Sequence, residues 1–349
     1  MAFQVLDIMT LLLPLFIILI GCELFTNGIE WLGVKLGLTE STTGSILAAV
    51  GTALPETVVP IMAIIFATGT GGSEIAEGAI LGAPFMLATL AMLVGGVAIF
   101  VAHRRGRRAP TLNVSEEHVG LDIKSFLAAY SFAVIAGLFL QGSGDTARAL
   151  RFLIAIFLFA LYAIYVRKML RQDSKKIGEP ESLYFTRAFS EMRERAPSTF
   201  TVMVQVISSL GMIIIGAKIF VGGIETVSME LGVSNIILAF LIAPIATELP
   251  EKFNSVLWYW RGKDTLALGN ITGAMVFQSS IPVSIGLLFT DWTLWPINIL
   301  SMLLAMAAIL LIYWEMRTFK SLSYKSLLLS GSFYVVFLLL LVLYPPPIA

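Results

Sequence analysis

The chain has 349 residues, of which 57% are hydrophobic and only 13% are charged. Soluble globular proteins carry about 25% charged residues, so this composition excludes an ordinary soluble domain and indicates repeated crossing of a lipid bilayer. The net charge is zero but carries no information about partners, because the charges are distributed asymmetrically. We expect no nucleic acid ligand. The single cysteine, Cys22, excludes an intrachain disulfide and a thiolate metal cluster.

Apolar stretches separated by polar turns predict an all-α membrane protein with ten transmembrane helices. The predicted spans are 5–34, 41–68, 75–101, 122–141, 147–170, 199–232, 235–260, 264–289, 293–316 and 322–344. The first and sixth exceed about 20 residues, so we expect them to be tilted or to extend out of the bilayer. The polar segment 171–198 is too short for a core of its own, and we interpret it as a cytoplasmic linker.

Basic residues predict the orientation of these spans. The loops after the first, third, fifth, seventh and ninth spans would share one side of the membrane, and they hold most of the lysine and arginine residues. The opposite side has only Arg148 and Arg151 near a span end. By the positive-inside rule the basic side is cytoplasmic, so we expect a multi-pass protein of the cell membrane with both termini outside.

Two acidic motifs interrupt the second and seventh spans. Residues 51–56 read GTALPE and residues 246–251 read ATELPE. A carboxylate inside the membrane costs about 2.5–3.5 kcal/mol, and the proline before each glutamate removes a helical hydrogen bond and exposes the carbonyl four residues earlier. Carboxylate, carbonyl and hydroxyl oxygens are the ligands that Ca²⁺ prefers. The candidate ligands are Glu56, Gly51 and Thr52 in the first motif, and Glu251, Ala246 and Thr247 in the second.

The two motifs belong to an internal repeat. An offset of 195 positions aligns residues 21–56 with residues 216–251 without a gap, and twelve of these 36 positions are identical. The register then shifts by four, so that residues 78–83 align with residues 269–274. Five spans separate the two copies, and this odd number threads them through the membrane in opposite directions, as in secondary transporters. We therefore predict two inverted five-helix repeats, at 1–170 and 199–349, joined by the linker 171–198.

In the motifs at 51–56, 78–83, 246–251 and 269–274, the chain resembles the calcium/cation antiporter superfamily, which includes the sodium/calcium exchangers. Its signature repeats are G-T-S-x-P-E followed by G-N-x-x-G-S, one pair in each half. The resemblance implies the exchanger fold, with Glu56 and Glu251 chelating Ca²⁺ and with Thr52 and Thr247 supplying oxygens beside them. It also implies that spans 2, 3, 7 and 8 form the core and that spans 1 and 6 slide across it.

The sequence departs from this family pattern at six positions. Residues of the signature that usually carry oxygen are replaced by Ala53, Glu248, Ala83, Ala274, Leu87 and Gln278. Several oxygens of the monovalent-cation sites are therefore missing, which weakens the prediction of sodium coupling. Gln278 keeps an amide that is placed to face the site.

Glu248 adds a third carboxylate to the second motif. In a helix it would lie three residues before Glu251 on the same face. Two carboxylates this close rarely both stay ionised without a cation, so Glu248 is a candidate proton carrier or sodium ligand. The alternative is that Glu248 points into the entrance of the site and attracts cations without binding them.

Together these features predict an antiporter that exports Ca²⁺ in exchange for a monovalent cation. Both ions would use the same carboxylates in turn, because an empty set of buried charges is too costly to carry across the membrane. The resemblance slightly favours Na⁺ over H⁺, and it makes a passive cation channel or an inactive transporter-like scaffold less favoured than either exchanger. The sequence has no phosphate-binding loop or catalytic triad, so we expect neither an enzyme nor a cofactor, and we expect the chain to act as a monomer.

Overall fold

The computed structural model describes residues 5–36, 54–67, 71–172, 182–187, 197–248, 255–256, 258–260 and 262–343. Its helices are α1 (Val5–Lys35), α4 (Leu54–Phe66), α5 (Gly71–Met86), the π-helical segment η2 (Leu87–Ala91), α6 (Met92–Arg104), α7 (Glu116–Phe139), α8 (Asp145–Gln172), α9 (Tyr184–Arg187), α10 (Thr199–Leu231), α11 (Asn235–Thr247), α13 (Asp264–Phe289), α14 (Pro296–Phe319) and α15 (Tyr324–Leu343). The prediction of an all-helical membrane protein is confirmed for these residues. One addition was not predicted: the short strands β1 (Thr111–Leu112) and β2 (Leu322–Ser323) pair antiparallel.

Eight of the described helices are long and apolar enough to cross a membrane. The predicted limits agree closely with the observed ones, as for span 264–289 and helix α13 (Asp264–Phe289). The count of ten is not confirmed, because the second and seventh spans are described only in part, as the 13-residue helices α4 and α11. The third span is longer than predicted and runs through α5, η2 and α6 from Gly71 to Arg104.

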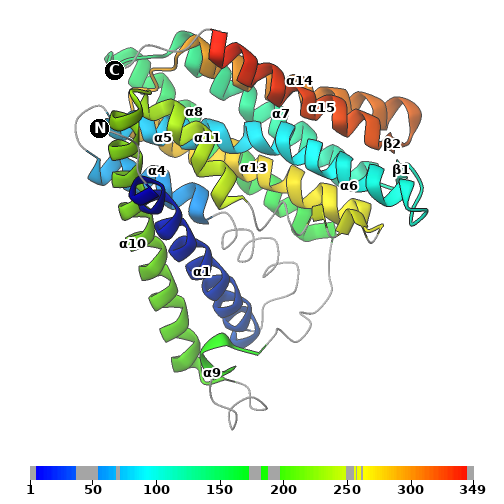
Figure 1. Ribbon diagram of the computed structural model, residues 1–349, viewed down its shortest axis with the longest axis horizontal. Coiled ribbons are helices and arrows are strands. Elements are labelled where there is room, and N and C mark those ends of the chain that lie inside the picture. Colours follow the sequence, from blue (N-terminus) through cyan, green and yellow to red (C-terminus); the bar gives the residue numbers. More distant parts are fainter. Residues whose placement is uncertain are drawn as a thin grey trace.

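Helices α1 and α10 lie side by side and project from the remaining helices (Figure 1). A methyl group on Gly21 of α1 would lie 2.9 Å from the side chain of Ile213, and one on Gly28 would lie 2.8 Å from that of Val206. Residue numbers therefore rise along α1 while they fall along α10, so the two helices are antiparallel. Glycine at these positions lets the two backbones approach closely, as small residues do between membrane helices.

The contact between α1 and α10 follows the internal repeat of the sequence. Gly21 of α1 contacts Ile213 of α10, and Gly216 of α10 contacts Ile18 of α1 in the same way. A methyl group on Gly216 would lie 2.8 Å from the side chain of Ile18. Positions 18 and 21 become 213 and 216 when the repeat offset of 195 is added. Each helix thus contacts the other with the same surface, as expected for two elements related by a two-fold axis. The antiparallel pair shows at this interface the inversion that the odd span offset predicted.

The buried apolar side chains form two clusters, and helices α5 and α11 contribute to both. One cluster lies among α1, α4 and α10, and the other lies among α6, α7, α8, α13, α14 and α15. Ala79 of α5 belongs to the first cluster and its neighbour Ile80 to the second, and α11 divides in the same way between Ala239 and Phe240. Helices α5 and α11 therefore lie at the boundary between the α1–α10 pair and the rest of the bundle.

Helices α5 and α11 cross closely at Gly82. A methyl group on Gly82 would overlap the backbone oxygen of Phe240 and lie 2.8 Å from the ring of Pro244. Pro244 has no N–H to donate to the carbonyl of Phe240, so this carbonyl is free of its usual helical partner. The glycine of the repeated motif therefore permits the approach that holds the end of α11 against α5.

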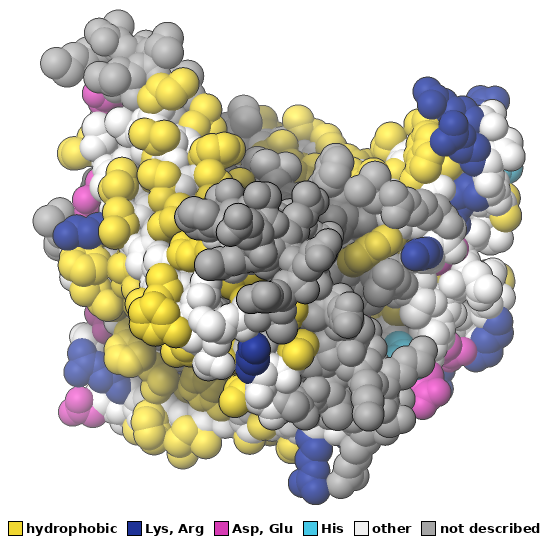
Figure 2. All heavy atoms as spheres, turned by 90° about the horizontal axis from the view of Figure 1, so that it is seen from below, with side chains coloured by type: hydrophobic (Ala, Val, Ile, Leu, Met, Phe, Trp, Pro, Cys, Tyr) yellow, Lys and Arg dark blue, Asp and Glu magenta, His cyan; other side chains and the backbone are white. Residues whose placement is uncertain are grey.

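Exposed apolar side chains cover the outer sides of α1 and α10. They include Leu13 and Phe16 on α1 and Ile207 and Ile215 on α10. Figure 2 shows hydrophobic side chains gathered in a broad surface on the left of the view. A surface of this size is expected to face lipid tails rather than water. The predicted lipid environment is consistent with this arrangement.

Strands β1 and β2 and the start of α13 meet at one end of the bundle. Their contacts connect loops that were predicted to share one side of the membrane. Strand β1 follows α6, and strand β2 precedes α15. Beside them, Arg108 forms two short bonds with Asp264 at the start of α13, Nη1 to Oδ1 at 2.7 Å and Nη2 to Oδ2 at 2.9 Å. The loops after the third, seventh and ninth spans therefore lie together, as the alternation of spans requires. Which side faces the cytoplasm stays a prediction.

Candidate cation site

Glu56 lies in the first turn of α4 and is 4% exposed. The described part of α4 begins at Leu54, so Pro55 and Glu56 both lie in its first turn. The preceding residues Gly51 and Thr52 lie outside the described residues, so the predicted exposure of the Gly51 carbonyl stays a prediction.

Glu248 caps the C-terminal end of α11 and is completely buried. Its backbone N–H donates to the carbonyl of Pro244 at 3.1 Å. The backbone of Ala246 and Thr247 belongs to α11, but their side chains and the whole of Glu251 lie outside the described residues. A helix C-terminus carries partial negative charge, which disfavours an ionised carboxylate. A bound cation or a proton on Glu248 would remove this unfavourable interaction.

Gln278 of α13 joins Glu248 in the same buried place. The Nε2 group of Gln278 donates to Oε1 of Glu248 at 3.2 Å, and the glutamine side chain is 1% exposed. The other amide atom, Oε1 of Gln278, has no hydrogen-bond partner in the described part of the chain. The two atoms of the amide are distinguished by this bonding pattern, which places the nitrogen toward the carboxylate. Gln278 thus keeps an oxygen that a cation can use.

Helix α4 lies between the other two helices that carry these residues, and the Gln278–Glu248 hydrogen bond links those two directly. Helix α4 packs against both α11 and α13, and also against α5 and α10. The structure therefore brings Glu248 and Gln278 together, and it places Glu56 on a neighbouring helix. No group of three acidic, histidine or cysteine side chains suited to a metal occurs among the described residues, which do not include Glu251.

The repeat partner of Gln278 in the first half of the chain is the apolar Leu87, and that of Glu248 is Ala53, which lies outside the described residues. Leu87 and Ala83 are buried among hydrophobic side chains, so neither position offers a side-chain oxygen. Leu87 opens the π-helical segment η2, in which the Thr89 hydroxyl donates to the carbonyl of Phe85 at 2.6 Å. π-Helical turns are frequent at functional sites because they change the direction of side chains within a helix.

A buried acid that the sequence did not single out lies on α7. Asp122 is 2% exposed and accepts two hydroxyl hydrogen bonds, from Tyr165 of α8 at 2.9 Å and from Thr272 of α13 at 2.7 Å. Thr272 belongs to the repeated motif at 269–274. Asp122 therefore ties the second-half motif to α7 and α8. The sequence placed this aspartate at the edge of a span, where a solvated acid is ordinary.

Replacing Asp122 with alanine should lower stability by about 1–3 kcal/mol, because the Tyr165 hydroxyl would then be buried without an acceptor. Thr272 loses less, since its hydroxyl also lies 3.0 Å from the carbonyl of Leu268. The measurement is the thermal unfolding midpoint of the purified protein in detergent. The matched control is Tyr165→Phe. It removes the hydroxyl itself, so no buried donor is left without an acceptor, and it should cost only about 0.5–1.5 kcal/mol. An alanine variant as stable as this control would contradict the assignment.

Comparison with known protein families matches most of the chain. A family model described as sodium/calcium exchanger protein matches residues 6–170 and 201–343. An uncharacterised membrane protein of Methanocaldococcus jannaschii is 22% identical over 278 residues, covering 80% of each chain. A protein of Alkalimonas amylolytica named antiporter CaxA is 23% identical over 276 residues, covering 79% of this chain and 78% of that protein.

Solved structures show the same fold. An H⁺/Ca²⁺ exchanger, CAX, matches with a TM-score of 0.74 and 16% identity, covering 97% of this chain and 82% of that one. A sodium-calcium exchanger, NCX_Mj, matches with a TM-score of 0.58 and 20% identity, covering 96% of this chain and 98% of that one. The predicted exchanger-like fold is confirmed by both matches.

Proposed function

The chain belongs to the sodium/calcium exchanger protein family, and from this membership we propose that it exports Ca²⁺ in exchange for a monovalent cation. The observation that carries the proposal is the burial of two acids, Glu56 and Glu248, on helices that contact each other within the bundle. Buried carboxylates in a membrane protein require a cation, a proton or a charged partner, and they mark ion pathways. An exchanger uses this requirement, because its site is filled by one ion or the other at each crossing.

The proposed ligands come from both halves of the chain. Glu56 and Glu251 would hold Ca²⁺, and Glu248 and Gln278 would extend the site on the side of the second half. The remaining proposed oxygens are those of Thr52, Thr247, Gly51 and Ala246. Competition for the same carboxylates would enforce exchange, since moving the site while it is empty leaves uncompensated buried charge. The close packing of α1 against α10 at their glycines would let the two helices move as one unit, as a pair that slides across the core requires.

Sodium is the monovalent ion that the family signature implies, and the proton is a second candidate that one observation favours. Ala83 and Leu87 are buried apolar residues at positions where the signature supplies ligand oxygens. Glu248, by contrast, is a completely buried acid at a helix C-terminus, where a proton is favoured over an ionised carboxylate. A proton needs a single acidic group rather than a full coordination shell.

Uptake of ⁴⁵Ca²⁺ into proteoliposomes under imposed gradients tests the proposal. The antiporter should accumulate Ca²⁺ when Na⁺ or H⁺ is more concentrated inside, and it should not do so when both gradients are absent. Ca²⁺ entry that is independent of either gradient would indicate a channel instead. Lack of transport with Ca²⁺ and with other divalent and monovalent ions would indicate an inactive scaffold. The gradient that drives uptake identifies the exchanged ion.

A further inference from the structure

Arg151 of α8 is a buried cation that the exchange mechanism does not use. Its side chain is 1% exposed, and its Nη2 group donates to the carbonyl of Gly142 at 2.9 Å. The Nε and Nη1 groups have no hydrogen-bond partner in the part of the chain that the structure describes. A buried donor without an acceptor is unfavourable, and more so when it carries a charge. The guanidinium therefore calls for an acceptor that is not part of the described protein.

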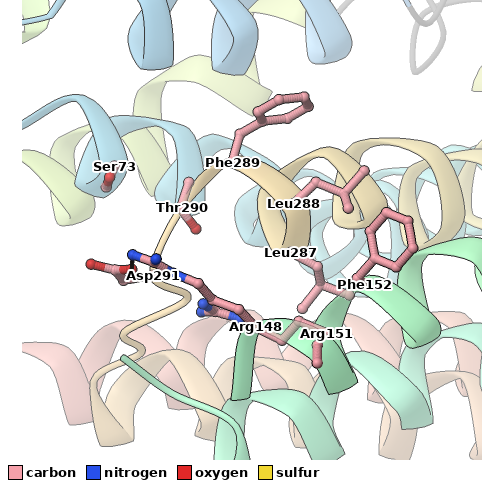
Figure 3. Close-up of a pocket in the computed structure, with 10 residues that line it drawn as sticks. Ser73, Arg148, Arg151, Phe152, Leu287, Leu288, Phe289, Thr290 and Asp291 are labelled. Carbon is pink, nitrogen blue, oxygen red and sulfur yellow. Dashed lines mark ion pairs between the residues drawn. The ribbon is translucent and has the colours of Figure 1, made fainter. Parts of the chain in front are cut away.

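Arg151 also lines a pocket of about 650 Å³. It is formed where α5 and α8 begin and where α13 ends, and Figure 3 shows the side chains that line it. Its polar lining consists of Arg148, Arg151, Ser73, Thr290 and Asp291. This volume is within the range of ordinary ligand pockets and exceeds what a single ion needs.

The acidic residues near the pocket leave the open donors of Arg151 unpaired. Asp291 lies 3.9 Å from Arg148, and both side chains are more than half exposed, so this ion pair is weak. Glu77 is close enough to Arg151 for an electrostatic attraction. The two side chains form no ion pair within 4.0 Å among the described residues. The pocket thus contains two guanidinium groups, one weakly paired and one with open donors.

The surroundings of the pocket favour an anion with an apolar tail. Arg148 and Ser73 lie in the first turns of α8 and α5, where the partial positive charge of a helix start adds to that of the guanidinium groups. Phe152, Leu288 and Phe289 line the apolar side of the pocket, and both phenylalanines are largely exposed. Three membrane-spanning helices have their ends here, so the pocket lies at the level where lipid headgroups meet lipid tails.

We propose that this pocket binds a phosphate-type oxyanion between Arg148 and Arg151. Arginine is suited to this role because its planar array of N–H groups matches phosphate oxygens in pairs. The phosphate of an anionic phospholipid and free inorganic phosphate share this chemistry. With a phospholipid bound, the acyl chains would lie along Phe152 and Phe289, on the lipid-facing side of the pocket.

The test is the thermal unfolding midpoint of the purified full chain in detergent, titrated separately with inorganic phosphate and with short-chain phosphatidylglycerol. Chloride at matched ionic strength is the reference for phosphate, and short-chain phosphatidylcholine is the reference for phosphatidylglycerol. We expect a saturable rise for the wild type, and at least a tenfold higher half-saturating concentration for Arg151→Gln and for Arg148→Gln. Arg167→Gln, an exposed arginine at the opposite end of α8, is the matched control and should behave as the wild type.

The variants keep the proposal testable even where one of them folds poorly. Arg148 is largely exposed, so Arg148→Gln should fold normally, and without ligand Arg151→Gln should be as stable as the wild type because a buried unpaired charge is removed. A rise with phosphatidylglycerol alone identifies a lipid headgroup, and an equal rise with inorganic phosphate identifies a free anion. The proposal is overturned if neither ligand raises the midpoint beyond its reference, or if the Arg148 and Arg151 variants respond as the wild type does.

Discussion

Replacing Glu56 with glutamine should abolish gradient-driven Ca²⁺ uptake in proteoliposomes. Glutamine has nearly the same size as glutamate and preserves the packing in the first turn of α4, but it carries no negative charge. The desolvated Ca²⁺ ion relies on carboxylate charge for its binding, so this substitution removes the interaction and not merely a contact. We expect initial ⁴⁵Ca²⁺ uptake to fall to the level of empty liposomes under a Na⁺ or an H⁺ gradient.

Glu117→Gln is the matched control for this experiment. Glu117 lies in the first turn of α7, as Glu56 does in α4, but it is exposed whereas Glu56 is buried. Its neutralisation should leave uptake close to that of the wild type. Thermal unfolding of both variants checks that loss of transport is not loss of fold. Normal uptake by a well-folded Glu56→Gln protein would refute the assignment of Glu56 to the cation site.

Glu251→Gln tests the two-fold character of the same site. The repeat aligns Glu251 with Glu56, so its neutralisation should abolish uptake to the same extent. Full loss from either substitution would support a single shared site, because two independent sites would each retain part of the transport. Transport that survives in one variant only would place the ion on one half of the protein.

The arrangement of helices could be predicted from the sequence because two independent signals agreed. Hydropathy gave spans such as 264–289, and the offset of 195 gave the antiparallel relation that Gly21 and Gly216 show at the α1–α10 interface. Both signals depend on short-range properties of the chain, namely the apolar length needed to cross a bilayer and the recurrence of similar residues. Such properties are fully present in a single sequence.

The surroundings of individual charges could not be predicted in this way. Asp122 and Arg151 lie near the ends of predicted spans, where acidic and basic side chains are usually solvated. Their burial depends on neighbours from distant segments, such as Thr272 on α13 for Asp122. The hydrogen bond that Gln278 donates to Glu248 likewise joins two helices. The motif alignment had already selected both residues, but it did not predict that they would be bonded to each other. Pairing across helices is a tertiary property that hydropathy does not contain.

The contact of Arg108 with Asp264 gives the largest expected effect on stability. The two side chains are only 8% and 4% exposed, and Asp264 also accepts the backbone N–H of Asn113 at 2.8 Å. Replacing Arg108 with alanine would leave a buried carboxylate without its cation, and removing one partner of a buried pair costs about 3–5 kcal/mol. The free energy of unfolding in detergent, measured by denaturant titration, should fall by this amount.

The pair Lys320–Glu116 is a natural control, because its nitrogen–oxygen distance of 2.7 Å equals that of Arg108–Asp264. Its side chains are 67% and 42% exposed, so water screens the interaction and Lys320→Ala should leave the free energy of unfolding close to that of the wild type. Combining Arg108→Ala with Asp264→Ala should cost less than the sum of the single changes, by about 0.5–3 kcal/mol. Equal costs for the buried and exposed pairs would show that bond length, and not burial, decides the stability of these contacts. We expect burial to decide it, because the unpaired charge left behind can be hydrated only at the exposed site.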